Sequence, residues 1–195
     1  MRNRRLDEIE LVAIIGKPAR NVSKEDALNY VAGYCIGLDM TVRGAEERSM
    51  RKSIDTFTVM GPWMVTPDEI ADPHNLDLNL TVNGQPRQNN NTKNLIIKIH
   101  ELIEWASIYY TLHPGDLFMT GTPDGVVDCQ PGDVVVTSIE GIGDLVNRQA
   151  NQAERVGRPE PGGRLQIPRV QQPGVCGSLQ ALRAATNPDD SQFRH

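Results

Sequence analysis

The strongest constraint on the fold is a stretch in which apolar and polar residues alternate and which ends in Asn83-Gly84. Over residues 76–82 every second residue is apolar, the pattern of a strand with one face in the core and one in solvent. Asn-Gly is the preferred pair for a two-residue type I′ turn, so a return strand is expected over residues 85–91. Pro86 has no N–H to donate to a ladder, which predicts that this return strand lies at a sheet edge.

A second feature is an acidic pair, Glu8 and Glu10, which opens the apolar run 11–15. In a strand these two side chains point to the same face. Neighbouring carboxylates repel each other, and a hard cation such as Mg²⁺, Mn²⁺ or Ca²⁺ between them relieves the repulsion. Asp39, an isolated charge in another apolar run, is the candidate third ligand. Taken alone, the spacing also fits a solvated strand face, with Asp39 capping a turn.

Further elements are expected from caps and periodicity. Ser23 followed by Asp26 resembles a capping box and predicts a helix over residues 23–33. Apolar residues at helical spacing after Thr92 predict a second helix over residues 92–110. The remaining predictions are a buried strand at 35–42, a loop or short helix at 43–51, a turn at 61–63 and a single helical turn at 67–70. Strands are predicted at 117–120, 134–139 and beyond 141.

Composition narrows the class of protein. The chain of 195 residues suits one domain with a sizeable core. A net charge of −5 argues against nucleic acid or an anionic membrane as the main partner, and no apolar run reaches the roughly 20 residues that span a bilayer. Three cysteines form neither an even disulfide framework nor a metal pair, which favours a cytoplasmic protein. Residues 149–195 are rich in Gln, Arg, Pro and Gly, so a disordered tail is predicted after a domain at 1–148.

The order of several short motifs resembles the catalytic domain of the fumarylacetoacetate hydrolase family. Each motif is weak alone, because Asn-Gly and Pro-Gly-Asp are common turns, but their order and spacing together are specific. The motifs are Glu8-x-Glu10-Leu11, Ile15-Gly16-Lys17, Gly33-Tyr34, Leu38-Asp39, Arg43, Lys52-Ser53-x-Asp55-Thr56-Phe57, Gly61-Pro62, Val82-Asn83-Gly84-x-x-Arg87-Gln88, Leu112-x-Pro114-Gly115-Asp116, Thr120-Gly121-Thr122-Pro123-x-Gly125-Val126 and Glu140-Gly141-Ile142-Gly143. The resemblance implies an α+β, mostly β fold of rolled mixed sheets.

The resemblance also implies site roles. Glu8, Glu10 and Asp39 would hold Mg²⁺ or a similar ion, and Lys52 would supply a fixed positive charge beside it. Arg43 and Thr122 would contact substrate oxygens, although Arg43 is equally suited to pair with Asp55 in a structural role. The substrate would be a small 2-oxo or enol (di)carboxylic acid. The reaction would be C–C hydrolysis, isomerisation or decarboxylation through a metal-stabilised enolate.

The chain departs from the family pattern in two places. Only seven residues precede Glu8, so the front segment that carries a water-activating His and Glu in some members is expected to be missing. Glu46 stands where members commonly have Gln, and it is the first alternative base to consider. Decarboxylation or tautomerisation is therefore expected to outpace hydrolysis. The competing hypothesis is a non-catalytic remnant that binds metal and ligand. A homodimer is expected, because family members commonly pair through this domain.

Overall fold

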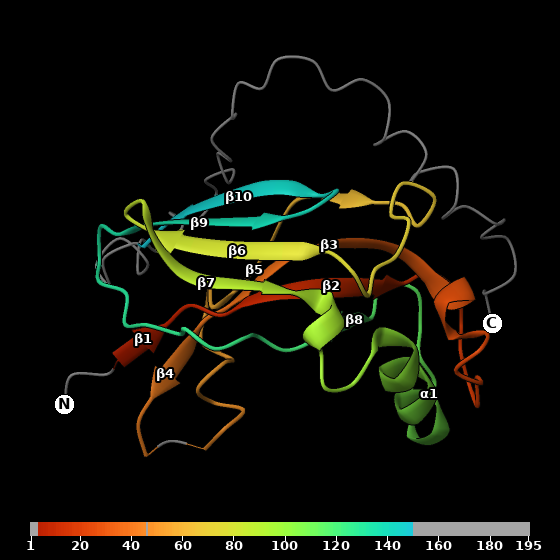
Figure 1. Ribbon diagram of the computed structural model, residues 1–195. Coiled ribbons are helices and arrows are strands. Elements are labelled where there is room, and N and C mark those ends of the chain that lie inside the picture. The colour runs from red at the N-terminus through yellow and green to blue at the C-terminus, as the bar shows by residue number, and fades with distance from the viewer. Residues whose placement is uncertain (1–3, 46, 150–195) are drawn as a thin grey trace, which may run out of the picture. The chain divides into compact units, whose positions relative to one another are not determined.

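The computed structural model describes residues 4–45 and 47–149, which form two four-stranded sheets, one two-stranded sheet and short helices (Figure 1). The α+β, mostly β fold class is confirmed. The sheets were expected to be mixed, but every strand pair in the described residues is antiparallel. Several neighbouring strands, such as β6 with β7 and β9 with β10, follow each other in the chain, and short connections of this kind produce antiparallel pairs.

The first sheet carries the acidic pair. Its order is β5 (Thr58–Val65), β3 (Val31–Asp39), β2 (Ile9–Ile15) and β8 (Leu117–Met119). The strand β2 is central and almost wholly buried, because its side chains are covered on both faces of the sheet. This explains why its sequence is a continuous apolar run rather than an alternating one.

The second sheet contains the predicted hairpin. Its order is β10 (Gly143–Arg148), β9 (Val134–Ile139), β6 (Asp77–Val82) and β7 (Gln85–Asn91). Asn83 and Gly84 have φ of 51° and 76°, as a type I′ turn requires, and β7 lies at the edge. Both the hairpin and the edge position are therefore confirmed. The two sheets pack against each other through contacts of β2 with β6, β3 with β9 and β5 with β10.

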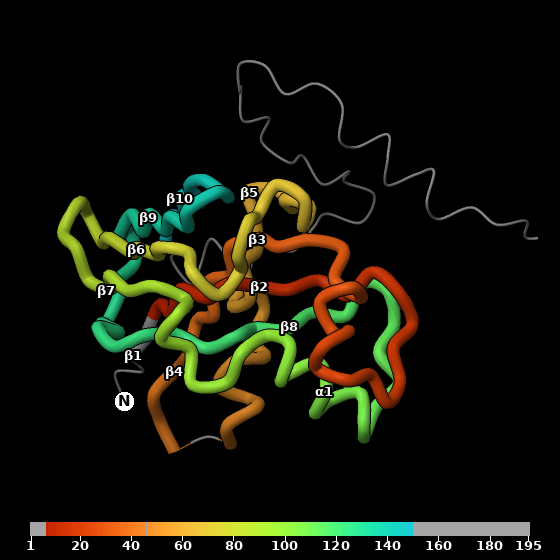
Figure 2. Tube along the Cα trace, turned by 45° about the vertical axis from the view of Figure 1, so that its right-hand side comes forward, coloured from red at the N-terminus to blue at the C-terminus, as the bar shows by residue number. Residues whose placement is uncertain are grey.

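The smaller elements lie near opposite ends of β2. The strand β1 (Arg4–Leu6) pairs with β4 (Thr41–Arg43). Figures 1 and 2 both place β4 and the segment after it away from the helix α1 (Ile99–Tyr109). The 3₁₀ helices are η1 (Ala27–Tyr30) and η2 (Thr92–Asn94). None of the helices in the described residues is long and apolar enough to cross a bilayer.

The predicted helix at 23–33 is wrong. The Ser23 hydroxyl donates to Asp26 Oδ2, a contact between side chains that lacks the backbone bonds of a capping box. Only the single turn η1 follows before β3 begins at Val31. Pairing of β3 with β2 takes the residues from Val31 onward into the sheet. Gly33 suits this position because a Cβ there would lie 2.5 Å from Met64 Cγ on β5. Tertiary pairing thus overrides the local helical signal.

The second predicted helix begins later than expected. The Asn91 side chain caps η2 by accepting from Lys93 N, and α1 starts only at Ile99. Two groups fix this start: Lys98 N donates to Glu101 Oε2 (2.9 Å), and Ile99 N donates to His74 Nε2 (3.2 Å). His74 is distant in sequence, so the true start of the helix is set by a tertiary contact.

Two further corrections concern boundaries. Residues 61–63, predicted as a turn, lie inside β5, where a cis Gly61-Pro62 bond coincides with a register shift against β3. Gln149, assigned to the tail, is buried and donates to both carboxylate oxygens of Asp7. Gln149 thus contacts the strand-rich domain, and the division of the chain into 1–148 and 149–195 stays a prediction. The prediction of disorder for the rest of the tail, 150–195, lies outside the described residues.

Candidate metal and substrate site

Three carboxylates meet where β2 begins and β3 ends. Glu8 directly precedes β2, Glu10 lies on it, and Asp39 is the last residue of β3. The backbone keeps them together, because Asp39 N donates to Glu8 O at 2.9 Å. All three residues are buried, and one carboxylate oxygen from each lies within 4.8 Å of the other two. The structure therefore brings together the three acids that the sequence singled out.

The electrostatics of this cluster are most visible at Glu10. Burial raises the pKa of Glu10 to about 7, and the charges of Asp39 and Glu8 act in the same direction. The Gly121 N–H, 2.7 Å from Glu10 Oε2, and the Lys52 ammonium oppose this rise. A carboxylate that is reluctant to ionise without a compensating charge is suited to bind a cation.

Two cations reach the cluster from the chain that follows β3. Lys52 Nζ donates to Glu8 Oε2 at 2.9 Å and also to Asp39 Oδ2. Partial burial lowers the pKa of Lys52, but the hydrogen bonds and charges of Asp39 and Glu8 outweigh burial and raise it overall. Arg43 Nη2 lies 3.7 Å from Glu8 Oε1. The ion-pair partner of Arg43 in the described residues is therefore Glu8 rather than Asp55.

Gln88 connects the two sheets beside the cluster, and its type and position alone had suggested no role for it. Its buried side chain accepts from Ile9 N (3.2 Å), between the two glutamates, and donates to Thr122 Oγ1 (2.9 Å) and Pro123 O (2.7 Å). All its amide hydrogens are thus used. Since Thr122 Oγ1 accepts here, its own proton remains available for another acceptor. The only sequence signal for Gln88 was its place in the motif after the hairpin.

The loop that carries Thr122 is held tightly against β7. A register shift in the hairpin leaves Arg87 as an extra residue beside Gln88. Gly125, at φ of 101°, approaches this bulge so closely that a Cβ would lie 2.1 Å from Arg87 O. No other residue type fits there without moving the backbone. The bulge and the glycine together position Thr122 one residue from the Gly121 N–H that binds Glu10.

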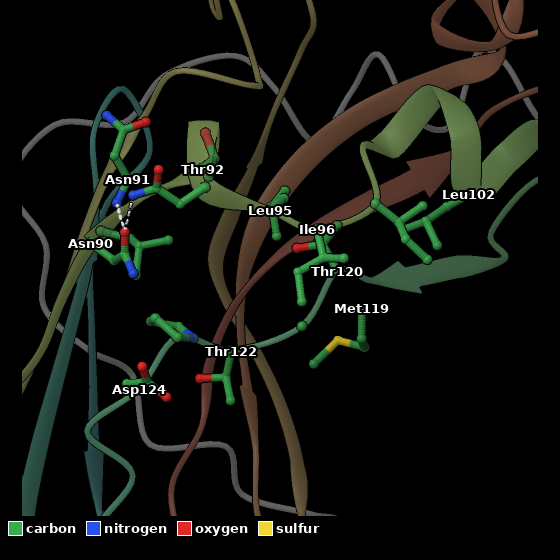
Figure 3. A pocket seen from close by; sticks show the side chains of 15 residues that line it. Asn90, Asn91, Thr92, Leu95, Ile96, Leu102, Met119, Thr120, Thr122 and Asp124 are labelled. Carbon is green, nitrogen blue, oxygen red and sulfur yellow. Dashed lines mark hydrogen bonds between the residues drawn. The ribbon is translucent and has the colours of Figure 1, made fainter.

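A cavity of about 540 Å³ opens on the Thr122 side of the cluster. Figure 3 shows Thr122 and Asp124 on one side of it, with Asn90 and Asn91 on the other. Leu95, Ile96 and Leu102 add apolar surface. Among the described residues no Lys or Arg lines this cavity, so it presents amide, hydroxyl and aliphatic groups to a ligand, with Asp124 as its only carboxylate.

The donor set fits a hard divalent cation. Three buried carboxylates at mutual ligand distance, one with a raised pKa, offer the all-oxygen coordination that Mg²⁺, Mn²⁺ and Ca²⁺ favour. In the described residues no other group of three or more His, Cys, Asp or Glu side chains has this proximity. Glu46, the alternative base, lies outside the described residues. Fold and site define a β-rich protein with a buried cluster of three carboxylates flanked by cations.

The chain belongs to the fumarylacetoacetate hydrolase family. The family profile described as "Fumarylacetoacetate (FAA) hydrolase C-terminal" matches residues 3–149. The maleylpyruvate hydrolase of Aquipseudomonas alcaligenes is 58% identical over 138 residues, which are 71% of this chain and 48% of the relative. A 4-hydroxyphenylacetate degradation bifunctional isomerase/decarboxylase of Escherichia coli is 48% identical over 146 residues, covering 72% of this chain and 34% of the relative.

A solved structure extends the likeness to the fold. The maleylpyruvate hydrolase from Sphingobium sp. SYK-6, in complex with manganese (II) ion and pyruvate, superposes with a TM-score of 0.73 at 42% identity. The match covers 76% of this chain and 55% of that protein. The chain thus spans between a third and about half of the length of these relatives.

Proposed function

We propose that this chain is the catalytic domain of a divalent-metal-dependent enzyme that acts on small acylpyruvate-type 2-oxo acids. The reaction is C–C hydrolysis, isomerisation or decarboxylation. The observation that carries the proposal is the convergence of Glu8, Glu10 and Asp39 with Lys52 bridging two of them. Relatives named as maleylpyruvate hydrolases and as an isomerase/decarboxylase support the substrate class, and the manganese and pyruvate in one of them support the site.

Glu8, Glu10 and Asp39 would hold the ion, and we propose Mg²⁺ as its physiological identity, with Mn²⁺ as the experimental substitute. When bound, such an ion supplies Lewis-acid polarisation of the 2-oxo acid oxygens. Lys52 contributes a fixed positive charge where negative charge develops on the substrate. Because Thr122 Oγ1 accepts a hydrogen bond from Gln88 Nε2, the Thr122 hydroxyl proton is available to donate to a substrate carboxylate. Arg43 adds a second cation at the same face.

The test is turnover with and without metal. The chain should consume maleylpyruvate or another acylpyruvate in the presence of Mn²⁺ or Mg²⁺ and lose this activity after chelation. Hydrolysis, isomerisation and decarboxylation should be measured on one preparation, so that their rates are comparable. Metal binding without turnover of any acylpyruvate would contradict the proposal that the chain is catalytic. It would support the alternative of a non-catalytic remnant that binds metal and ligand.

We further propose a cytoplasmic homodimer. Cys35 and Cys129 are free and buried, which suits a reducing compartment. On the outer face of α1, Trp105, Ile108 and Tyr109 are exposed apolar side chains that a second copy would cover. Light scattering at micromolar concentration should give twice the monomer mass, and a monomer mass would contradict the dimer.

A further inference from the structure

A second cavity, of about 490 Å³, opens on the other side of the acid cluster and differs sharply from the first in charge. Glu8 is among its lining residues, together with four cationic residues: Arg43, Arg48, Arg51 and Lys52. The cavity beside Thr122 has no cation among the described residues of its lining. The basic cavity reaches the acid cluster at Glu8, and the Thr122 cavity borders it at Gly121, whose N–H donates to Glu10. Within the described part of the chain, a substrate bound at the cluster therefore meets several cations on one side and none on the other.

The cations of this basic cavity are not all used within the protein. Lys52 bonds to Glu8 and Asp39, and Arg43 faces Glu8. The backbone of Arg51 accepts from Val42 N, which ties this stretch to β4. Arg48 is exposed and has no ion-pair partner among the described residues. The basic cavity therefore keeps positive charge beyond what the acid cluster neutralises, and Arg48 carries it.

We infer that the basic cavity binds a second carboxylate of the substrate and that Arg48 is its specificity-determining residue. A planar guanidinium matches a carboxylate in a bidentate fashion. The chain should then prefer dianionic 2-oxo acids, with the 2-oxo acid end at the cluster and the distal carboxylate at Arg48. Arg48 belongs to none of the sequence motifs that indicated the family. This inference rests on the proposed function, because it presumes that a 2-oxo acid binds at the cluster.

The test compares a monoanionic and a dianionic ligand. Calorimetry with saturating Mn²⁺ should measure the affinities of pyruvate and of 2-oxoglutarate for the unmodified chain, Arg48→Gln and Arg48→Lys. We expect Arg48→Gln to lower the affinity for 2-oxoglutarate by roughly tenfold or more, the range for losing a hydrogen bond to a charged group. The affinity for pyruvate should be unchanged. The affinity of Arg48→Lys for 2-oxoglutarate should lie between those of Arg48→Gln and the unmodified chain. Lys24→Gln, which removes an exposed charge near α1 rather than near the cluster, is the matched control.

The outcomes separate the two proposals. Equal affinities of Arg48→Gln and the unmodified chain for 2-oxoglutarate would overturn the second-carboxylate inference and leave the proposed function intact. The inference would also fail if Arg48→Gln lowers the affinity for both ligands equally, or if Lys24→Gln lowers the affinity for 2-oxoglutarate as much as Arg48→Gln does. Neither result would contradict the proposed function. Failure of both ligands to bind the unmodified chain with Mn²⁺ present would overturn the proposed function, and this inference with it.

Discussion

The acids and the cations of the site are held by very different parts of the molecule. Glu10 and Asp39 lie on the buried strands β2 and β3, and Glu8 directly precedes β2. The side chains of Glu8 and Asp39 are only 8% and 11% exposed. The cations come from the end of β4 and the loop after it, and the side chains of Arg43 and Lys52 are 53% and 42% exposed. The acid cluster is therefore positioned by the core of the fold, whereas the cations are positioned by a surface segment.

This difference implies a division of labour. Charges fixed in a sheet keep the ligand geometry that a metal requires, since a packed core resists small displacements. Charges on a solvated loop are free to adapt to a substrate, and surface loops tolerate changes of sequence. Metal binding should therefore depend on the strands and substrate selection on the loop. The following predictions test that separation, in order of decreasing effect.

The largest effect is expected from removing a ligand of the acid cluster. Glu10→Gln and Asp39→Asn should each weaken Mn²⁺ binding by more than about 100-fold, beyond the usual cost of losing an outer-shell partner, and should abolish turnover. The fold should survive, because Glu10→Gln relieves like-charge repulsion and keeps an acceptor for Gly121 N. Calorimetry measures the Mn²⁺ affinity, and circular dichroism shows whether the variants keep the fold. Glu25→Gln, at an exposed site, is the control, and unchanged Mn²⁺ affinity in both cluster variants would refute the ligand assignment.

Lys52→Met should separate catalysis from metal binding. The substitution removes the ammonium but keeps most of the side-chain volume. We expect kcat to fall by about 100- to 1,000-fold, as for loss of one group that stabilises developing negative charge. Mn²⁺ affinity should stay equal or improve, because Lys52 bonds to the same Glu8 and Asp39 carboxylates that would hold the ion. A parallel loss of metal affinity would show instead that Lys52 organises the acid cluster.

Gln88→Met should have an intermediate effect on activity, because Gln88 positions Thr122 and does not itself contact the substrate. It removes three hydrogen bonds and leaves Ile9 N and Pro123 O unpaired. The free energy of unfolding should drop by about 1–3 kcal/mol, and KM should rise about 10-fold as Thr122 loses its orientation. Thermal unfolding and steady-state kinetics provide the two readouts. Gln85→Met, exposed on the same strand, should change neither, and an unaltered KM for Gln88→Met would exclude a positioning role.

The smallest effect concerns pH. The ordinary pKa of a glutamate is near 4.5, and that of Glu10 is raised to about 7. The metal-free fold thus gains stability from protonated Glu10 at low pH and loses it as pH rises through 7. Mn²⁺ must displace this proton, so its affinity should be about tenfold weaker at pH 6 than at pH 8. Calorimetry in two buffers should detect proton release at pH 6 and little at pH 8, and equal affinities at both values would contradict the assignment.

Local chemistry in the sequence was enough to predict the elements whose structure depends on neighbouring residues. The hairpin at Asn83-Gly84 is the clearest case, since alternation and a turn with positive φ are local properties. The acid pair was also readable, because two residues two apart in a strand must share a face. Asp39 was a candidate partner as an isolated charge in an apolar run, the family motifs supported it, and the structure places it beside Glu8 and Glu10.

Only the tertiary structure decided the features that depend on residues far apart in the chain. The helical signal at Ser23 lost to pairing of β3 with β2, and α1 begins where His74 accepts its first N–H. Gln88 reaches Ile9, 79 residues away, and no local pattern encodes that contact. The contrast between a cavity lined by cations and one without them among its described residues likewise arises from folding, which brings loops after different strands to different sides of the acid cluster. Sequence periodicity records which face of an element is buried, but the partner that covers that face is chosen by packing of the whole chain.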